Sequence, residues 1–261
     1  MLKALKTRIQ QGYHTMAYPD GPAPELPERF AGMPTVDSSK CPEDCTSCMS
    51  DCPCGAVFRD TVSGQIRIDT GRCIFCGICE TACPNSAIRF TRGFQLAACR
   101  REDLIVGHEA RVAKAFHELS HKIFGRSLKL RQVSAGGCNA CEADTNVLNT
   151  LVWDIARFGI QFVASPRHAD GLLVTGPVSG HMKAALEKTY HAVPEPKIVI
   201  AVGACAISGG LYRDMPEVNN GVSGVIPVDL FVPGCPPHPL TILDGLLRFL
   251  GKGAAKNSHE S

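Results

Sequence analysis

The sequence predicts two consecutive modules, an α+β module over residues 35–105 and an α/β module with a mostly parallel sheet over residues 127–252. Two runs of four cysteines, each followed by a short strand-like segment, predict the first module. Runs of Val, Ile and Leu separated by amphipathic segments predict the second, because parallel strands are buried on both faces. We also expect an N-terminal helix and arm over residues 1–34, a linker helix over 106–126 and a tail over 253–261.

The composition excludes several classes of protein. The 261-residue chain has a formal net charge of +2 and no run of five basic residues, so nothing predicts nucleic-acid binding. No apolar stretch approaches the ~18 residues that span a bilayer. The fourteen cysteines cluster at metal-site spacings, and the start lacks the apolar core of a secretory signal. We therefore expect a reducing compartment and metal-bound thiolates rather than disulfides.

The two cysteine runs contain the metal ligands that we predict for the first module. The run over 73–84 has three cysteines separated by two residues and a fourth followed by proline, and the run over 41–53 differs by one extra residue after Cys41. This spacing lets a short loop place three cysteines around one [4Fe–4S] cube, while the fourth points to a second cube. The predicted ligands are Cys41, Cys45, Cys48 and Cys83 for the first cluster, and Cys73, Cys76, Cys79 and Cys52 for the second.

Zinc is the alternative metal, because pairs of cysteines separated by two residues also bind it. Two matched runs that each end in Cys-Pro favour iron–sulfur clusters instead. Between the runs, residues 56–58 and 65–68 flank Ser63-Gly64 and predict a hairpin. Residues 87–90 repeat the first of these strands after their own Cys-Pro, so we predict a duplicated, ferredoxin-like module with two clusters.

The N-terminal segment differs from both modules in its pattern of apolar, basic and proline residues. Leu2, Leu5 and Ile9 recur at helical spacing among basic residues, which predicts an amphipathic helix. This helix either rests on a membrane-bound partner or the lipid interface, or is a locally packed or frayed terminus. Five prolines between residues 17 and 34 predict an extended arm that lies over another surface, because proline is excluded from helix interiors and sheet centres.

Strand-like and helical segments alternate after a connector helix predicted over 108–124. The predicted strands cover 128–133, 160–164, 171–175, 197–202 and 225–232, and the predicted helices cover 142–158, 181–191 and 240–250. This pattern predicts a flavodoxin-like α/β fold with a parallel sheet covered on both faces.

Four further cysteines follow predicted strands of this sheet. The carboxyl ends of parallel strands meet at one edge, where open α/β sheets bind ligands. We therefore predict a third [4Fe–4S] cluster with the ligands Cys138, Cys141, Cys205 and Cys235. Nearby glycines allow close approach of the backbone to the cube. Buried structural thiols are the alternative interpretation, and we assign Cys54 and Cys99 to that class.

Both halves of the chain resemble known subunits. The Tyr18-Pro19 arm and the motif at 71–77 are similar to the two-cluster ferredoxin subunit of formate hydrogenlyase and of respiratory complex I. The motifs at 136–142, 165–170, 203–205 and 233–237 resemble the small subunit of group 4 energy-converting [NiFe] hydrogenases and the related 20 kDa subunit of complex I. Two residues separate Cys138 from Cys141, which favours the hydrogenase branch. Fusion of the two halves and the extra residue after Cys41 depart from the family pattern.

The resemblance implies an oxidoreductase complex subunit that passes electrons through three [4Fe–4S] clusters to or from a NiFe site on a large subunit. The implied partners are that large subunit, membrane subunits of the same complex, and a formate dehydrogenase-type or ferredoxin electron donor. The implied location is peripheral, on the cytoplasmic face of the inner membrane. A complex I-like subunit that delivers electrons to quinone is the alternative. We expect Glu142 to take part in proton transfer; its alternative role is a first-turn glutamate favoured by the helix dipole.

Overall fold

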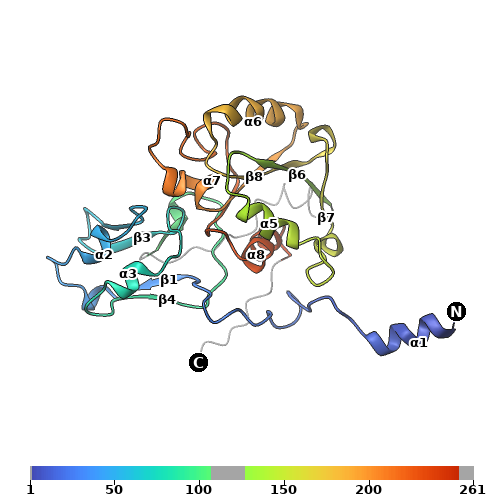
Figure 1. Ribbon diagram of the computed structural model, residues 1–261, viewed down its shortest axis with the longest axis horizontal. Coiled ribbons are helices and arrows are strands. Elements are labelled where there is room, and N and C mark those ends of the chain that lie inside the picture. Colours follow the sequence, from blue (N-terminus) through green and yellow to red (C-terminus); the bar gives the residue numbers. More distant parts are fainter. Residues whose placement is uncertain (1, 107–126, 253–261) are drawn as a thin grey trace.

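The computed structural model describes residues 2–106 and 127–252, and almost all of the predicted linker helix and the tail lie outside these residues. Figure 1 shows the larger α/β module above a smaller module built from the cysteine runs, with the N-terminal helix α1 (Leu2–Gln11) extending away from both. The domain boundaries stay a prediction.

Short antiparallel strands build the smaller module. Strands β2 (Val57–Arg59) and β3 (Ile66–Asp69) form the predicted hairpin, and β5 (Ile105–Val106) pairs with the other edge of β3. Strands β1 (Pro34–Val36) and β4 (Ile88–Phe90) form a second antiparallel pair. The helical turns η1 (Ser38–Lys40), α2 (Ser47–Ser50), α3 (Ile78–Thr81) and η2 (Glu102–Leu104) complete the module. Because the buried side chains of Val57, Ile66 and Ile88 pack with those of cysteines, the core of this module lies against the two cysteine runs.

The α/β module contains a five-stranded parallel sheet. Its strands are β6 (Leu128–Ser134), β7 (Ile160–Phe162), β8 (Gly171–Thr175), β9 (Ile198–Val202) and β10 (Leu230–Val232). They lie in the order β10-β9-β8-β6-β7, and every pairing is parallel. Counted within the module from the β7 edge, this is the order 2-1-3-4-5 of flavodoxin-like folds, which confirms the predicted α/β class.

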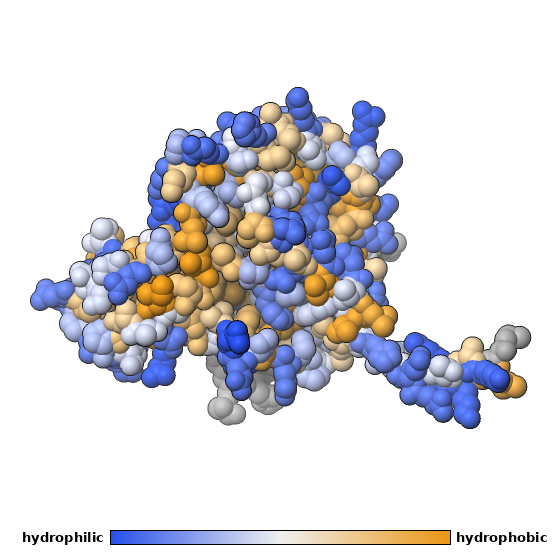
Figure 2. Space-filling view, viewed as in Figure 1, coloured by the Kyte–Doolittle hydropathy of each residue, from blue (hydrophilic) through white to orange (hydrophobic). Residues whose placement is uncertain are grey.

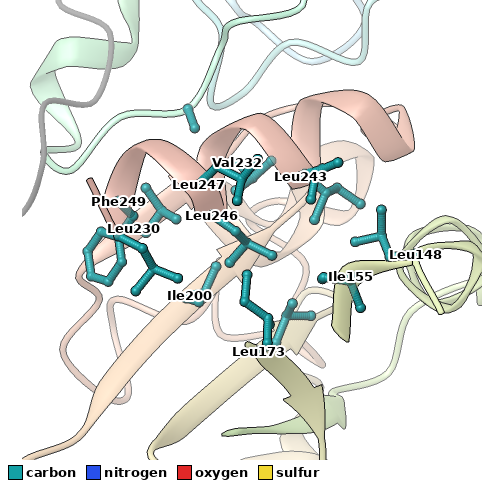
Figure 3. Close-up of a cluster of buried hydrophobic side chains, with 14 of the residues drawn as sticks. Leu148, Ile155, Leu173, Ile200, Leu230, Val232, Leu243, Leu246, Leu247 and Phe249 are labelled. Carbon is teal, nitrogen blue, oxygen red and sulfur yellow. The ribbon is translucent and has the colours of Figure 1, made fainter. Parts of the chain in front are cut away.

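Helices cover both faces of the sheet. Helices α5 (Ala140–Val147) and α8 (Pro239–Phe249) cover one face, and α6 (Gly180–Ala192) and α7 (Ala204–Ser208) cover the other. Side chains alternate between these layers along each strand. Leu173 and Ile200 pack under Leu246 and the rest of α8, as Figure 3 shows, whereas Leu172 and Val199 pack toward α6 and α7. Short turns η3 (Ile155–Phe158), η4 (Pro166–His168) and η5 (Gly210–Tyr212) connect the elements.

Two predicted elements are shorter than expected. The helix predicted over 142–158 ends at Val147, and residues 155–158 form the separate turn η3. The Thr150 hydroxyl donates to the Val147 carbonyl at 2.7 Å, a local hydrogen bond that competes with continuation of the helix. The strand predicted over 225–232 begins at Leu230, because Pro227 has no N–H for a sheet and the residues before it form a turn closed by the Val222 carbonyl.

The proline-rich arm lies on the α/β module, as predicted. Met16, Ala23 and Leu26 pack against its core, and Tyr18 is 3% exposed. Arg157 donates to the carbonyls of Met16 at 2.6 Å and Tyr18 at 2.7 Å, so the arm is held by its backbone as well as by its side chains.

Helix α1 precedes the arm and buries none of its residues. Figure 2 shows it standing clear of the body of the molecule with a mostly hydrophilic surface. Leu2, Leu5 and Ile9 are nevertheless 84%, 60% and 73% exposed. No helix among the described residues combines the length and the apolar character needed to cross a membrane.

Candidate iron–sulfur sites

The first cysteine set surrounds a hollow in the smaller module. Its members come from both cysteine runs: Cys41, Cys45, Cys48 and Cys83. Apolar side chains such as Val36, Ile66 and Ile88 complete the wall of the hollow. Burial raises the pKa of Cys48, and the nearby charges of the other three thiols raise it further. The structure therefore groups these four residues around one space, and their role as ligands of one cluster stays a prediction.

The second cysteine set surrounds another hollow in the smaller module. It contains the four predicted residues and one more: Cys52, Cys73, Cys76, Cys79 and Cys54. Burial is the largest cause that raises the pKa of Cys73 to about 12 and of Cys79 to about 11. The charge of Cys48 also contributes to the shift of Cys79, which places the first and second sets next to each other.

Cys54 corrects one sequence-based interpretation. We predicted a structural thiol, but Cys54 lines the second hollow and its sulfur lies 3.8 Å from that of Cys52. The hydrogen bond between the two sulfurs is the largest cause that lowers the pKa of Cys52 to about 5, and the same bond together with burial raises the pKa of Cys54. Cys99, in contrast, packs against the hydrophobic core as predicted.

The third cysteine set gathers at the carboxyl edge of the parallel sheet. Its members follow β6, β9 and β10: Cys138, Cys141, Cys205 and Cys235. Burial raises the pKa of Cys141, and the charges of Cys205, Glu142, Cys235 and Cys138 add to the rise. Gly203 allows the Cys141 sulfur to lie close to the backbone, because a Cβ atom at position 203 would be 2.5 Å from that sulfur. The structure thus brings together cysteines that are up to 97 residues apart, since 235 − 138 = 97.

A pocket between the modules is lined by Cys235 of the third set and by residues that lie next to the second set in sequence. Ile74 and Phe75, which stand between Cys73 and Cys76, line it from the smaller module. The arm contributes Phe30, whose ring meets that of His238 edge-on at a centroid distance of 5.5 Å. The loop between Cys73 and Cys76 therefore faces the same pocket as Cys235 of the third set.

The donor atoms of all three sets fit iron–sulfur clusters. Each set offers at least four thiols, and in each set burial raises the pKa of a member (Cys48, Cys73 and Cys141) and so disfavours its thiolate form unless a metal supplies positive charge. Among the described residues, no group of three or more His, Cys, Asp or Glu is arranged to hold a single metal ion. A cubane has a different requirement, because each ligand sulfur binds a separate iron atom and the four sulfurs lie farther apart.

Backbone donors also point to sulfur in the smaller module. The Ala56 N–H donates to Cys52 Sγ and the Ala87 N–H donates to Cys83 Sγ, each at 3.2 Å. The Phe75 N–H donates to Cys73 Sγ at 3.3 Å. Such bonds stabilise the negative charge of cluster ligands and set the potential of a bound cluster.

Glu142 lies in the first turn of α5, beside Cys141. Its side chain is buried, with 6% of the residue exposed, and one carboxylate oxygen accepts hydrogen bonds from Ser134 and Thr175, both at 2.6 Å. These hydroxyls stand at the ends of β6 and β8, so Glu142 ties α5 to the edge that carries the third set. Proton transfer through Glu142 stays a prediction.

Comparison with known proteins agrees with this division of the chain. A family model described as "NADH ubiquinone oxidoreductase, 20 Kd subunit" matches residues 138–249, and a "4Fe-4S binding domain" model matches residues 66–89. The chain is 45% identical over 131 residues to a probable membrane-bound hydrogenase subunit, mbhJ, of Pyrococcus furiosus, a match that covers 50% of this chain and 78% of the relative.

Two further relatives come from different complexes. Formate hydrogenlyase subunit 7 of Escherichia coli is 43% identical over 126 residues, which cover 48% of this chain and 49% of the relative. A subunit of the NADH-quinone oxidoreductase of Desulfovibrio desulfuricans is 44% identical over 112 residues, which cover 43% of this chain and 61% of the relative. With its parallel sheet and the cysteines at the carboxyl edge, the chain belongs to the family of the 20 kDa subunit of NADH-ubiquinone oxidoreductase and carries a 4Fe-4S binding motif ahead of it.

Proposed function

We propose that this protein is the electron-transfer subunit of a membrane-associated, energy-converting [NiFe] hydrogenase of the formate hydrogenlyase type. The observation that carries the proposal is the gathering of twelve cysteines, far apart in sequence, into three adjacent sets of four. Each set would hold one [4Fe–4S] cluster, which supplies one-electron transfer when bound. The first two clusters lie in a ferredoxin-like arrangement produced by the duplicated cysteine runs.

The order of the sets defines the path of electrons. The first set would hold the cluster that accepts electrons from a donor of the formate dehydrogenase or ferredoxin type, and the second and third sets would hold the clusters that carry them onward. The pocket shared by Phe75 and Cys235 supports this path, because it makes the second and third sets neighbours. The nickel–iron centre lies on a large subunit against the loop that carries Cys138, Cys141 and Glu142, where Glu142 exchanges protons.

The assembly is peripheral to the membrane, on its cytoplasmic face. Relatives named as membrane-bound hydrogenase and formate hydrogenlyase subunits support the hydrogenase assignment, and so does the spacing of two residues between Cys138 and Cys141. The relative from NADH-quinone oxidoreductase supports a second candidate, a subunit that delivers electrons to quinone.

Purification of the native complex through a tag on this chain separates the two candidates. We expect a nickel-containing large subunit to co-purify and the complex to evolve hydrogen from reduced methyl viologen. A Cys205→Ala variant should keep the nickel but lose most hydrogen evolution, because electrons no longer reach the large subunit. Quinone reduction by a complex without nickel would contradict the hydrogenase assignment and support the second candidate.

A further inference from the structure

The last cysteine of each run stands at the start of an equivalent turn. The Gly55 N–H donates to the Cys52 carbonyl and the Ser86 N–H donates to the Cys83 carbonyl, both at 3.2 Å. Gly55 has a φ of +59° and Ser86 a φ of +49°, so both turns use a left-handed residue at the same place. Cys54 in the first turn therefore corresponds to Asn85 in the second.

The backbone around the two sulfurs is also equivalent. One residue after the left-handed position, Ala56 and Ala87 each donate an N–H bond of 3.2 Å to the cysteine sulfur four positions earlier. The duplicated module therefore gives each of the two sulfurs the same main-chain donor. Neighbouring side chains are then one source of any difference between the two sulfurs.

The side chains do differ at the corresponding positions. Cys54 Sγ lies 3.8 Å from Cys52 Sγ, within the range of a hydrogen bond between sulfur atoms, and both line the second hollow. In the part of the chain that the structure describes, Cys83 Sγ has no such side-chain partner, although Asn85 lines the first hollow. The second set thus has one sulfur more than a cubane needs.

We propose that Cys54 is not an iron ligand but donates an S–H hydrogen bond to the Cys52 thiolate and thereby raises the reduction potential of the second cluster. The inference rests on the proposed function, in which the second set holds a [4Fe–4S] cluster. A thiol is a weak donor, but a charged acceptor strengthens the bond. Hydrogen bonds to cluster sulfurs stabilise the reduced state, which carries one more negative charge, so the extra donor shifts the potential upward.

The test uses the full chain purified anaerobically, with reduction potentials measured by EPR-monitored redox titration. Cys54→Ala removes the donor, Cys54→Ser replaces it with a hydroxyl, and Asn85→Ala is the matched control in the equivalent turn. We expect Cys54→Ala to lower the potential of the second cluster and Cys54→Ser to stay nearer to the wild-type value. Asn85→Ala, whose site lines the first hollow, should leave the potential of the second cluster unchanged. Iron content should equal that of the wild type in all three variants.

A second measurement detects the S–H proton of Cys54 directly. After exchange into D2O, ENDOR spectra of the reduced second cluster should show a deuteron coupling that is absent in Cys54→Ala and present in Asn85→Ala. Unchanged potentials together with an unchanged coupling in Cys54→Ala would overturn the proposal. Loss of about four irons from Cys54→Ala but none from Cys52→Ala would also overturn it, because Cys54 would then be the ligand. A wild-type chain without iron would instead contradict the proposed function.

Discussion

Tyr18 is the residue through which the arm reaches deepest into the α/β module. Its hydroxyl donates to Asp244, whose carboxylate also accepts from Arg248 Nε at 2.9 Å. Burial is the largest cause that raises the pKa of both Tyr18 and Asp244. A buried carboxylate needs such donors, because each lost hydrogen bond to a charged group costs about 1.5–3 kcal/mol.

Substitution of Tyr18 therefore tests the docking of the arm. We predict that Tyr18→Phe lowers the free energy of unfolding by about 1.5–3 kcal/mol. Tyr13, on the same arm, is 87% exposed, so Tyr13→Phe is the matched control and should leave stability unchanged. Urea unfolding of the anaerobic protein, followed by circular dichroism, measures both. Equal midpoints for the two variants would show that the buried hydroxyl contributes nothing.

His238 is a residue whose contribution to the free energy of unfolding depends on pH. Burial lowers its pKa below the ordinary value of 6.5, so the folded protein binds a proton here less readily than the unfolded chain does. The contribution of neutral His238 is fully present above pH 6.5 and is lost as the pH falls through that value and the lowered pKa. We predict that wild-type stability falls more steeply between about pH 7 and about pH 5 than that of His238→Asn.

The asparagine variant keeps an acceptor for the Leu240 N–H, which His238 Nδ1 binds at 3.1 Å. His191→Asn, at an exposed position, is the control and should follow the wild-type profile. Unfolding free energies measured across this pH range provide the comparison. Parallel profiles for wild type and His238→Asn would contradict the predicted role of burial.

Among the elements, α8 packs closely against Ala97, which lies in the segment after β4. A Cβ atom on Gly245 would lie 2.8 Å from Ala97 Cβ, a distance at which one of the two must move. Alanine is the better helix former by about 1 kcal/mol, so helix propensity alone predicts that Gly245→Ala stabilises the protein. We predict a net loss of about 1–3 kcal/mol instead, because the site is overpacked.

A compensating double substitution distinguishes overpacking from other causes of the predicted stability loss. Gly245→Ala combined with Ala97→Gly relieves the overlap and should recover most of the lost stability in a denaturant titration. A Gly245→Ala variant more stable than the wild type would show that the segment moves aside at little cost.

For helix α1, in contrast to α8, we expect no contribution to stability, since none of its residues is buried. Deletion of residues 2–11 should leave the free energy of unfolding unchanged. It should also reduce the fraction of protein that sediments with vesicles of anionic lipid, because the helix joins exposed apolar residues with Lys3, Lys6 and Arg8 and has no acidic residue. Leu5→Ser should reduce sedimentation in part. Unaltered sedimentation of the deletion variant would favour a packed or frayed terminus.

The helices and strands also show which parts of the fold can be predicted from sequence patterns. Strands β8 and β9 were predictable because both faces are buried and their residues are almost all apolar, as in Ile198–Val202. The end of α5 at Val147 was not, because it depends on side-chain hydrogen bonds such as that of Thr150 rather than on hydrophobic period. Strand β1 was missed because a three-residue strand that begins with Pro34 has no alternating pattern of its own.

At the scale of the whole molecule, local spacing predicted which cysteines gather, because ligand spacing and strand ends are sequence properties. Cys54 was missed because spacing gives no reason to expect a fifth thiol two residues after Cys52. The signal that could have found it is the alignment of the duplicated turns at 52–56 and 83–87, in which Cys54 stands opposite Asn85. The pocket beside Cys235 was not predictable, because it depends on where the arm places Phe30 against the α/β module.

The measurement that most directly tests three clusters in one chain is the iron content of anaerobically purified protein, recorded together with its EPR spectrum. We predict about twelve irons in the wild type and about eight in each of Cys83→Ala, Cys52→Ala and Cys235→Ala, with a different signal lost in each. Cys45→Ala should lose the same signal as Cys83→Ala, because the ligands cross between the two runs. About eight irons in the wild type, unchanged by Cys235→Ala, would contradict the third cluster and with it the electron path to a large subunit.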